Sequence, residues 1–477
     1  MPASIYGQIQ IGQDIDGEAP GDNSGMSVSL SSSGNIVAIG AYANDGNGSE
    51  SGHVRVFENQ NGSWIQVGQD IDGEAAMDIS GETIDLSSDG TILAIGAPFN
   101  DGNASDAGHV RVFEYNGNSW VQVGQDIDGQ EENDFFGDDL AISANGEFLV
   151  VSATDSYDGR GHIGIYEHVN DSWVQVGQDI EGESMFDSFG WSVAMSSNGQ
   201  IVAAGARDND DGGNFAGHVR VFEIQNGNWV QIGLDIDGGG EQDYLGTSVS
   251  LSANGSVVAV GAPETFEVGD KGFVQVYRNE NDSWVQIGQD IVGEADGDQF
   301  GSSLSLSASG SVLVVGAPYN GGNGPISGHV RIYQNINDSW VQMGTDINGE
   351  AAQDRFGGGV SMSSDGRTVA IGAVFNDGVP NQSGHVRVFD LSTVLSVDEV
   401  NETSNLIVYP NPAATHVQIH VENGFILKEV RVFNSVGQRM LLTTNVSSLD
   451  ISSLSRGTYI VELVTNQGIT TRKLLIE

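Results

Sequence analysis

The sequence predicts an all-β fold, and three observations support this prediction. A ten-residue stretch, Trp64 to Gly73, recurs along the chain with small changes. Its Gly-x-Asp-Ile part starts at seven positions, spaced by 53 to 56 residues: Gly12, Gly68, Gly124, Gly177, Gly233, Gly288 and Gly344. A fixed period of this length indicates one supersecondary unit copied in tandem. The 67 glycines and only 9 prolines suit tight turns between short strands, and no segment shows a helical period.

Each unit is predicted to contain four strands. In the second unit, residues 83–87 alternate polar and apolar side chains, and residues 88–90 form a tight turn. Residues 91–97 are almost continuously apolar, as expected for a strand covered on both faces. Residues 109–113 alternate again, and residues 120–123 form the fourth strand after another turn. Burial therefore falls toward the fourth strand, which is typical of the blades of a β-propeller.

The two ends of the repeat region predict how a ring of seven blades closes. The seventh unit stops after Phe389 and lacks the Trp-x-Gln-x-Gly strand. The N-terminus supplies this missing piece at residues 8–12, ahead of the first unit. We predict that this N-terminal strand pairs into the seventh blade, because closure removes a sheet edge that is prone to aggregation.

Two motifs recur in register within the units. Asp-x-Phe-Gly precedes the first strand in four units, starting at Asp134, Asp187, Asp298 and Asp354. Gly-Ala-Pro follows the second strand in three units, starting at Gly96, Gly261 and Gly316. Over residues 1–392 this pattern resembles the FG-GAP repeat of integrin-α-type seven-bladed propellers. Members of that family often carry a calcium loop between the first two strands, but short turns such as residues 88–90 stand here, so that site is not carried over.

Composition limits the classes of partner and chemistry. The net charge is −48, and residues 405–477 are nearly neutral, so the repeat region carries almost all of it. Such a surface repels phosphate backbones, which excludes nucleic acid and favours cations or a basic partner, or serves solubility alone. Cysteine is absent, which excludes disulfides and cysteine-based sites. No apolar run approaches the roughly 20 residues of a transmembrane helix.

The C-terminal residues form a second predicted domain. Residues 393–404 are a polar, acidic linker, and residues 405–477 contain Tyr409-Pro410-Asn411-Pro412 and strand-like segments at 430–434 and 457–461. Alternating strands separated by turns predict a small β-sandwich. The segment resembles the type A C-terminal sorting domain of type IX secretion cargo. This resemblance implies contact with the type IX secretion machinery, and a location that is secreted or on the outer-membrane surface.

The same resemblance implies a signal peptide for the first membrane. Residues 1–7 lack the basic region and apolar stretch of such a peptide. We therefore expect that the start is truncated or that the peptide is left out of the sequence.

Acidic loops between the units supply candidate metal ligands. The candidates are Asp14, Asp16, Glu18 and Asp22, which recur as Asp70, Asp72, Glu74 and Asp78 and have equivalents in the other units. Closely spaced carboxylates followed by glycine are typical of calcium sites, and calcium is the only cofactor predicted. The spacing lacks the complete EF-hand pattern. Alternatively, the Asp before Phe-Gly accepts hydrogen bonds from backbone N–H groups and caps a turn.

Other residues repeat once per unit or break the repeat. Six histidines begin third strands, where we expect structural hydrogen bonds, and six tryptophans at the rim are expected to pack between strands or, alternatively, to stack on sugars. Trp191 and Tyr244 depart from the repeat and mark either an asymmetric ligand site or local repacking. Arg160 and Arg207 are irregular as well.

No catalytic motif is visible, because nearly every polar residue repeats as scaffolding does. The predicted function is therefore a secreted or cell-surface binding or adhesion propeller for a protein or glycan, with calcium as the candidate cofactor. The alternative is an exported polysaccharide hydrolase or lyase. An enzyme would have to assemble its site from deviations in single units.

Overall fold

The computed structural model places the chain in two compact units, Met1–Leu395 and Ser396–Glu477. The structure describes residues 8–155, 159–263, 271–376 and 382–395 of the first unit and 406–409, 413, 415–421, 427–434, 439–444, 448–465 and 469–476 of the second. No helix in these described ranges is both long and apolar enough to cross a membrane.

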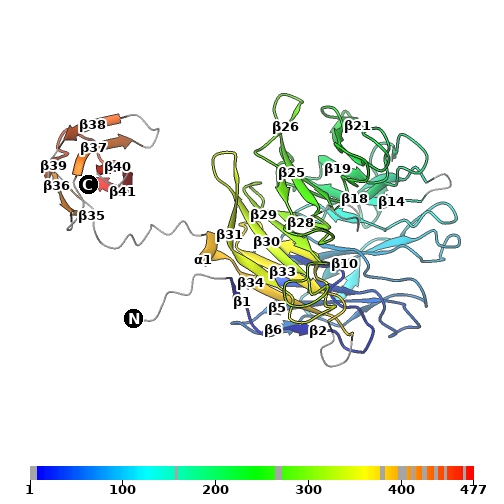
Figure 1. Cartoon of the computed structure of the whole chain (residues 1–477). Coiled ribbons are helices and arrows are strands. Elements are labelled where there is room, and N and C mark those ends of the chain that lie inside the picture. Colours follow the sequence, from blue (N-terminus) through cyan, green and yellow to red (C-terminus); the bar gives the residue numbers. More distant parts are fainter. Residues whose placement is uncertain are drawn as a thin grey trace. The chain divides into compact units, whose positions relative to one another are not determined.

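The described part of the first unit contains seven antiparallel sheets, which we number as blades 1 to 7 (Figure 1). Blades 1 to 3 consist of β3 (Val28–Leu30), β4 (Ile36–Ala41), β5 (His53–Asn59) and β6 (Trp64–Gln66); β8 (Ile84–Leu86), β9 (Ile92–Ala97), β10 (His109–Tyr115) and β11 (Trp120–Gln122); and β13 (Leu140–Ile142), β14 (Phe148–Ala153), β15 (His162–His168) and β16 (Trp173–Gln175). Blades 4 to 6 consist of β18 (Phe189–Met195), β19 (Ile201–Ala206), β20 (His218–Gln225) and β21 (Asn228–Gln231); β23 (Ser248–Leu251), β24 (Val257–Ala262), β25 (Phe273–Asn279) and β26 (Trp284–Gln286); and β28 (Ser303–Leu306), β29 (Val312–Ala317), β30 (His329–Asn335) and β31 (Trp340–Asn348). Blade 7 consists of β32 (Phe356–Met362), β33 (Thr368–Ala373), β34 (His385–Asp390) and β1 (Ile9–Gln10), and α1 (Ser392–Leu395) follows β34.

In six units the isoleucine of the Gly-x-Asp-Ile motif and the residue after it form a short strand of their own. These strands are β2 (Ile15–Asp16), β7 (Ile71–Asp72), β12 (Ile127–Asp128), β17 (Ile180–Glu181), β22 (Ile236–Asp237) and β27 (Ile291–Val292). Each pairs with the third strand of the preceding blade, beside the Trp strand. In blade 6 the two segments are continuous as β31, which shifts register between Val330 and Ile332 of β30. The isoleucine side chains are buried. The Gly-x-Asp-Ile motif therefore anchors each loop between blades to the blade before it.

Burial follows the predicted gradient. In β4, Val37 and Ile39 are almost fully buried, because neighbouring blades cover both faces of the second strand. Gly40 in this strand approaches the next blade so closely that an added Cβ would lie 2.0 Å from the Gly81 carbonyl oxygen. In the fourth strands, by contrast, Ile65 and Val121 are about half exposed. The all-β prediction is confirmed.

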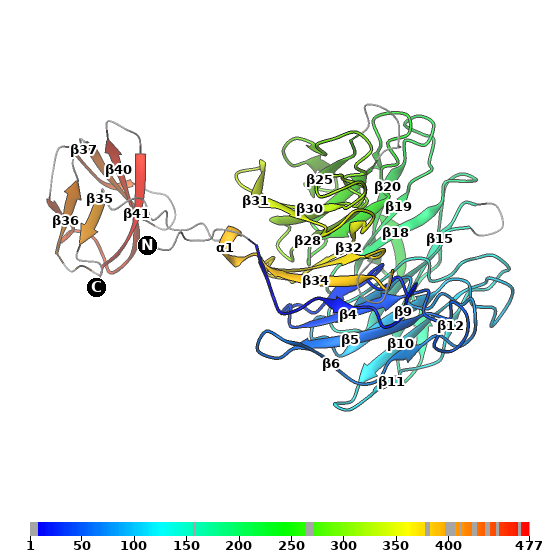
Figure 2. The same ribbon diagram turned by 60° about the horizontal axis from the view of Figure 1, so that its bottom comes forward.

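The first strands of the blades contact one another in cyclic order: β3, β8, β13, β18, β23, β28, β32 and again β3. Figures 1 and 2 show the first and last sheets side by side. β1 pairs with β34, with Ile9 opposite Asp390 and Gln10 opposite Phe389. The Ile11 N–H donates to the Val388 carbonyl oxygen at 2.7 Å. The prediction that the N-terminal strand closes the seventh blade is thereby confirmed.

Side chains connect the first strands across the ring, where no continuous ladder joins them. Asp85 accepts hydrogen bonds from the Ser29 hydroxyl of blade 1 and from the Ile142 N–H of blade 3, both at 2.9 Å. Asp139 accepts in the same way from Thr83 at 3.2 Å and from the Val193 N–H at 2.7 Å. Burial raises the pKa of Asp85 to about 6 and that of Asp139 to about 7.

The second unit has two sheets in its described residues. The three-stranded sheet consists of β35 (Leu406–Tyr409), β36 (His416–Val421) and β39 (Ser448–Asp450), and the four-stranded sheet of β38 (Arg439–Thr444), β37 (Leu427–Asn434), β40 (Gly457–Thr465) and β41 (Ile469–Ile476). Val417 from the first sheet and Val430 and Val461 from the second belong to one buried apolar cluster. This arrangement agrees with the predicted β-sandwich.

Candidate functional site

The aspartates that precede Phe-Gly, or Ser-Gly in the first two units, accept hydrogen bonds within the loops between blades. Asp22 is 2% exposed, and its Oδ2 accepts hydrogen bonds from the Ala19 N–H at 2.8 Å and from Asn44 Nδ2 at 3.2 Å. Asp78 repeats this arrangement with Ala75 at 2.9 Å and Asn100 at 3.0 Å. The geometry supports the interpretation that these carboxylates cap turns.

The other predicted ligands of the first loop have separate environments. Asp14 accepts a hydrogen bond from Gln10 Nε2 at 2.6 Å. Glu18 lies 3.3 Å from Arg55 Nη1, and the same guanidinium donates to the backbone carbonyl oxygen of Asp16, whose side chain is exposed. Asp70, Asp72 and Glu74 repeat these contacts with Gln66 and Arg111. In these two loops the four carboxylates therefore have separate partners, whereas in the equivalent loop before blade 5 Asp235 and Asp237 each offer an oxygen within 4.8 Å of the other and of a His218 nitrogen.

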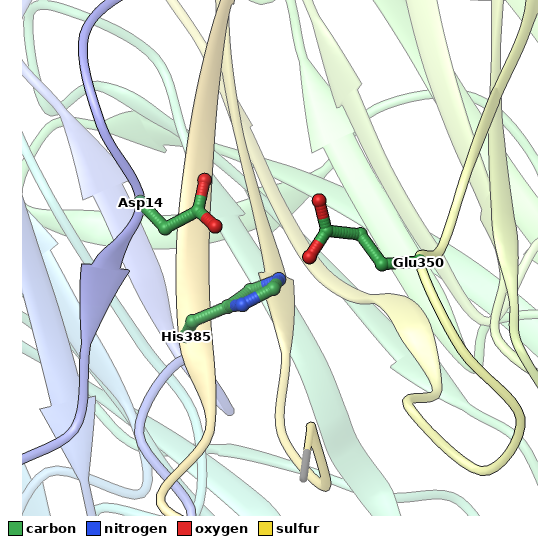
Figure 3. A group of neighbouring side chains, drawn as sticks. All are labelled: Asp14, Glu350 and His385. Atoms are coloured by element: carbon green, nitrogen blue, oxygen red, sulfur yellow. The ribbon is translucent and has the colours of Figure 1, made fainter. Parts of the chain in front are cut away.

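Carboxylates from different units do meet at the histidines. Figure 3 shows Asp14, Glu350 and His385 pointing toward one another, and one ligand atom of each lies within 4.8 Å of the others. The same grouping recurs as Glu18, His53 and Asp70, and as Glu74, His109 and Asp126. Sequence reasoning missed these groups because their members come from loops of successive units, which only strand pairing brings to one histidine.

The histidines in these groups are buried and electrostatically confined. Burial and then the adjacent arginine lower the pKa of His385, and the same causes lower the pKa of His109 to about 4. The Nε2 atoms of His53, His109 and His385 have no hydrogen-bond partner. The hydrogen bond expected from the sequence is therefore not found at these three atoms.

A neutral imidazole with two carboxylates is a donor set that suits a divalent metal. A cation, however, already stands beside each group: Arg387 Nη1 lies 3.5 Å from Glu350 Oε1. Comparison of the units shows that this arginine and the glutamate vary together. Five units have both, whereas blade 3 has Gln130 with Gly164, and blade 5 has Gly239 with Gln275. An ion pair between the arginine and the glutamate explains why both residues are absent from the same units. We therefore assign these groups to the frame, by which we mean the repeated residues that hold the blades together.

A pocket lies at the end of the propeller where the first strand of each blade begins and the second strand ends. This pocket of about 600 Å³, here called the mouth pocket, is lined by Tyr42, Trp191, Arg207, Tyr244, Tyr319 and Arg355, among others. The structure thus brings together Trp191, Tyr244 and Arg207, which the sequence marked as irregular, whereas Arg160 is not among the lining residues. The volume is typical of a small-molecule or sugar site.

Two arginines in the mouth pocket are held by aromatic rings. The Arg207 guanidinium carbon lies 4.0 Å from the centroid of Trp191 and 5.1 Å from that of Tyr244. Arg355 lies 4.8 Å from the centroid of Tyr319 and 4.6 Å from that of Phe375. Such contacts are attractive by about 0.5–2 kcal/mol and fix the orientation of the guanidinium plane.

Two positions of the repeat, which supply Met26, Trp191, Tyr244 and other residues of the mouth pocket, differ in every unit. The residues that follow Phe-Gly or its equivalent are Met26, Glu82, Asp138, Trp191, Thr247, Ser302 and Gly358. The second residues of Asp-x-Phe-Gly are Asn23, Ile79, Phe135, Ser188, Tyr244, Gln299 and Arg355. Seven units thus carry seven different residues at each position, although the buried positions around them repeat.

The second of these positions is also conformationally strained. All seven residues have φ between 53° and 56°, a left-handed conformation that favours glycine. Each such non-glycine residue costs about 1 kcal/mol or more, and the cost is greater for the β-branched Ile79. Glycine occurs at none of the seven positions. The same conformation recurs at non-glycine residues of other repeat positions, such as Glu50, Asp106 and Phe215, so it belongs to the turns of the repeat.

A second cavity adjoins the mouth pocket and shares Met26, Trp191, Thr247 and Ser302 with it. We call it the axial cavity. It adds Glu82 and Asp138 to the lining. Burial, and then the charge of Asp138, raise the pKa of Glu82 to about 7. Burial also raises the pKa of Asp138, which accepts a hydrogen bond from the Thr154 hydroxyl at 2.7 Å.

Comparison with known families confirms both resemblances seen in the sequence. Residues 15–57 and 293–333 match the model of the FG-GAP repeat, and residues 407–477 match that of the secretion system C-terminal sorting domain. No curated protein matches the chain. The sorting domain implies interaction with the type IX secretion machinery and indicates export to the cell surface or secretion.

Proposed function

We propose that this chain, an FG-GAP repeat protein with a sorting tail, is an exported binding module and that its ligand occupies the mouth pocket. The variation of the mouth positions carries this proposal. A repeat that served only as scaffold would keep the same side chain at each position, whereas here two positions per unit differ in all seven units. Divergence among residues that line an opening is a pattern expected of a recognition surface built on a shared frame.

A glycan is the ligand that this pocket supports best. Trp191 is 38% exposed, and Tyr244 is stacked on Phe215 with centroids 5.6 Å apart, so aromatic side chains form part of the lining of the opening. The C–H face of a sugar ring packs on such surfaces, while its hydroxyl groups require polar neighbours such as Gln299 and Ser302. A protein partner would need a larger apolar surface than a pocket of about 600 Å³ supplies.

The test is binding of the full chain to an array of extracellular polysaccharides, with and without calcium. Trp191→Ala should weaken the best ligand at least tenfold, because it removes the platform. Phe186→Ala is the matched control, since Phe186 is 73% exposed and does not line the pocket. Absence of any glycan binding, or equal losses in the two variants, would count against the proposal.

A polysaccharide hydrolase or lyase is the second candidate, and one observation favours it. Glu82, whose pKa is raised to about 7, lies beside Asp138 in the axial cavity and is repeated in no other unit. A carboxyl group that stays protonated near neutral pH can serve as a general acid. Product release from the bound polysaccharides, abolished by Glu82→Gln, would identify an enzyme; binding without turnover supports the binding module.

A further inference from the structure

We infer that the ligand of the mouth pocket carries an anionic group, a carboxylate or a sulfate on a sugar ring, and that Arg355 binds this group. The inference rests on the proposed function and deepens it. It starts from the unbalanced charge of Arg355 in a protein whose net charge is −48.

The arginines of the frame all have acidic partners close by. Arg55, Arg111, Arg220 and Arg387 lie 3.3 to 3.6 Å from the glutamates of their loops, and Arg331 pairs with both Glu294 and Asp346. Arg355 differs from them. Within the described residues its guanidinium forms no ion pair and donates no hydrogen bond, although the side chain is partly buried.

The surroundings of Arg355 fix its side chain without using its donors. Tyr319 and Phe375 contact the guanidinium through their ring faces, so the N–H groups at its edge stay available. A planar fork of donors held in place loses little entropy on binding and matches a carboxylate or sulfate with two parallel hydrogen bonds. The residue also has φ of 53°, so this unit keeps an arginine in a backbone conformation that favours glycine.

The second arginine of the pocket has a different role. Arg207 Nε lies 3.5 Å from Asp208 Oδ1, so its charge is already balanced in part. It also covers Trp191 and Tyr244, and it therefore extends the platform on which a sugar ring can lie. We assign the ring to Trp191 and Arg207, and the anionic group to Arg355.

The acidic surface opposes the approach of such a ligand, and this opposition has a measurable consequence. Repulsion between exposed charges is screened beyond about 8 Å at physiological ionic strength and reaches about 30 Å at 0.01 M salt. Contacts within a partly buried pocket are screened less. An anionic sugar should therefore associate faster at 0.15 M salt than at 0.01 M, which is the reverse of ordinary ion-pair binding.

The experiment uses calorimetry on the full chain with matched trisaccharides of glucose, galactose and mannose, each in neutral, uronic acid and sulfated forms. Wild type should bind an anionic form at least tenfold more tightly than its neutral counterpart. Arg355→Gln should weaken the anionic form at least tenfold and the neutral form by a smaller factor, so that the preference is lost. Arg278→Gln is the control, because Arg278 is exposed and lies 2.7 Å from Asp338, outside the pocket. The uronic acid and sulfated forms show which anion is preferred.

Three outcomes would overturn the inference. If neutral sugars bind as tightly as anionic ones and binding depends on Trp191 only, the proposed function stands and the anionic ligand falls. If Arg355→Gln weakens the binding of neutral and anionic sugars equally, Arg355 supports the shape of the pocket and does not bind the anionic group. If no form binds, the proposed function falls as well. Equal melting temperatures of wild type and Arg355→Gln exclude a folding defect as the cause.

Discussion

The frame and the mouth of this propeller are built from the same repeated unit, yet they follow opposite rules. In the frame, histidine, arginine and glutamate return in five of the seven units, and where the arginine is absent the glutamate is absent too. In the mouth, two positions carry seven different residues each, and one of them is strained in all seven. The contrast teaches that the residues that hold the blades together and the residues that vary between units occupy separate positions of the repeat, so each set can change without the other.

The largest loss of stability is expected when β1, the strand that completes blade 7, is removed. Deletion of residues 1–12 removes β1 from the edge of β34, where only β2 remains paired, and it removes the carbonyl oxygen of Ile11, to which Trp64 Nε1 donates at 2.8 Å. We expect the melting temperature of the full chain to fall by about 10 °C or more, since one blade loses its outer strand and the ring opens. Calorimetry measures the loss; an unchanged melt would refute closure by this strand.

Two neighbouring residues, Gln299 and Phe300, allow the stability effects of a mouth residue and a frame residue to be compared directly. Phe300 is fully buried in the core between blades 5 and 6, so Phe300→Ala should cost about 3–5 kcal/mol. Gln299, which precedes it, lines the mouth pocket with φ of 54°. Gln299→Gly should change stability by less than about 0.5 kcal/mol, because the relief of strain offsets the added freedom of the unfolded chain. Denaturant melts of both variants make the comparison; similar losses would erase the distinction.

The acidity of the axial cavity gives a smaller, pH-dependent effect. The pKa of Glu82 is raised from 4.5 to about 7 on folding, so its contribution to stability is present below pH 4.5 and is lost as the pH rises through 7. Glutamine stays neutral throughout this range. Glu82→Gln should therefore melt about 1–2 °C above wild type at pH 8 and close to wild type at pH 5. The exposed Glu114→Gln is the control and should show no such crossover.

Calcium in the loops between blades stays a prediction, and we expect its effect to be the smallest. Six of the eight predicted ligands already accept a hydrogen bond or pair with arginine, and only Asp16 and Asp72 present exposed carboxylates without such contacts to their side chains. Chelation should therefore shift the melting temperature by less than about 1 °C. A larger drop that calcium reverses would show that the ion binds the native state.

The sequence predicts the frame well, because the residues of the frame recur at the same position in successive units. The seven Gly-x-Asp-Ile motifs correspond to the loops that join the blades, and the missing strand after Phe389 identifies the N-terminal strand as its substitute. The aspartates of Asp-x-Phe-Gly cap turns as the alternative interpretation expected. These features depend on local pattern and on neighbouring units, which a linear reading can follow.

The mouth was predicted only in part. Trp191, Tyr244 and Arg207 stood out as departures from the repeat, whereas Arg355, Tyr319 and Phe375 did not, because each is unremarkable within its own unit. Their meeting depends on ring closure, which brings blades 4 to 7 and blade 1 to one opening. The raised pKa of Glu82 depends on burial that no sequence pattern reports. Aligning the seven units position by position would have found the variable sites.

The pairing of β1 with β34 has a consequence for biosynthesis. The partner of β1 is synthesised more than 370 residues later. The ring of blades therefore cannot close until the last repeat has been produced. A copy cut short anywhere between them would retain an unpaired end and remain vulnerable to proteases. Closure of the ring therefore depends on the last repeat as much as on the first strand.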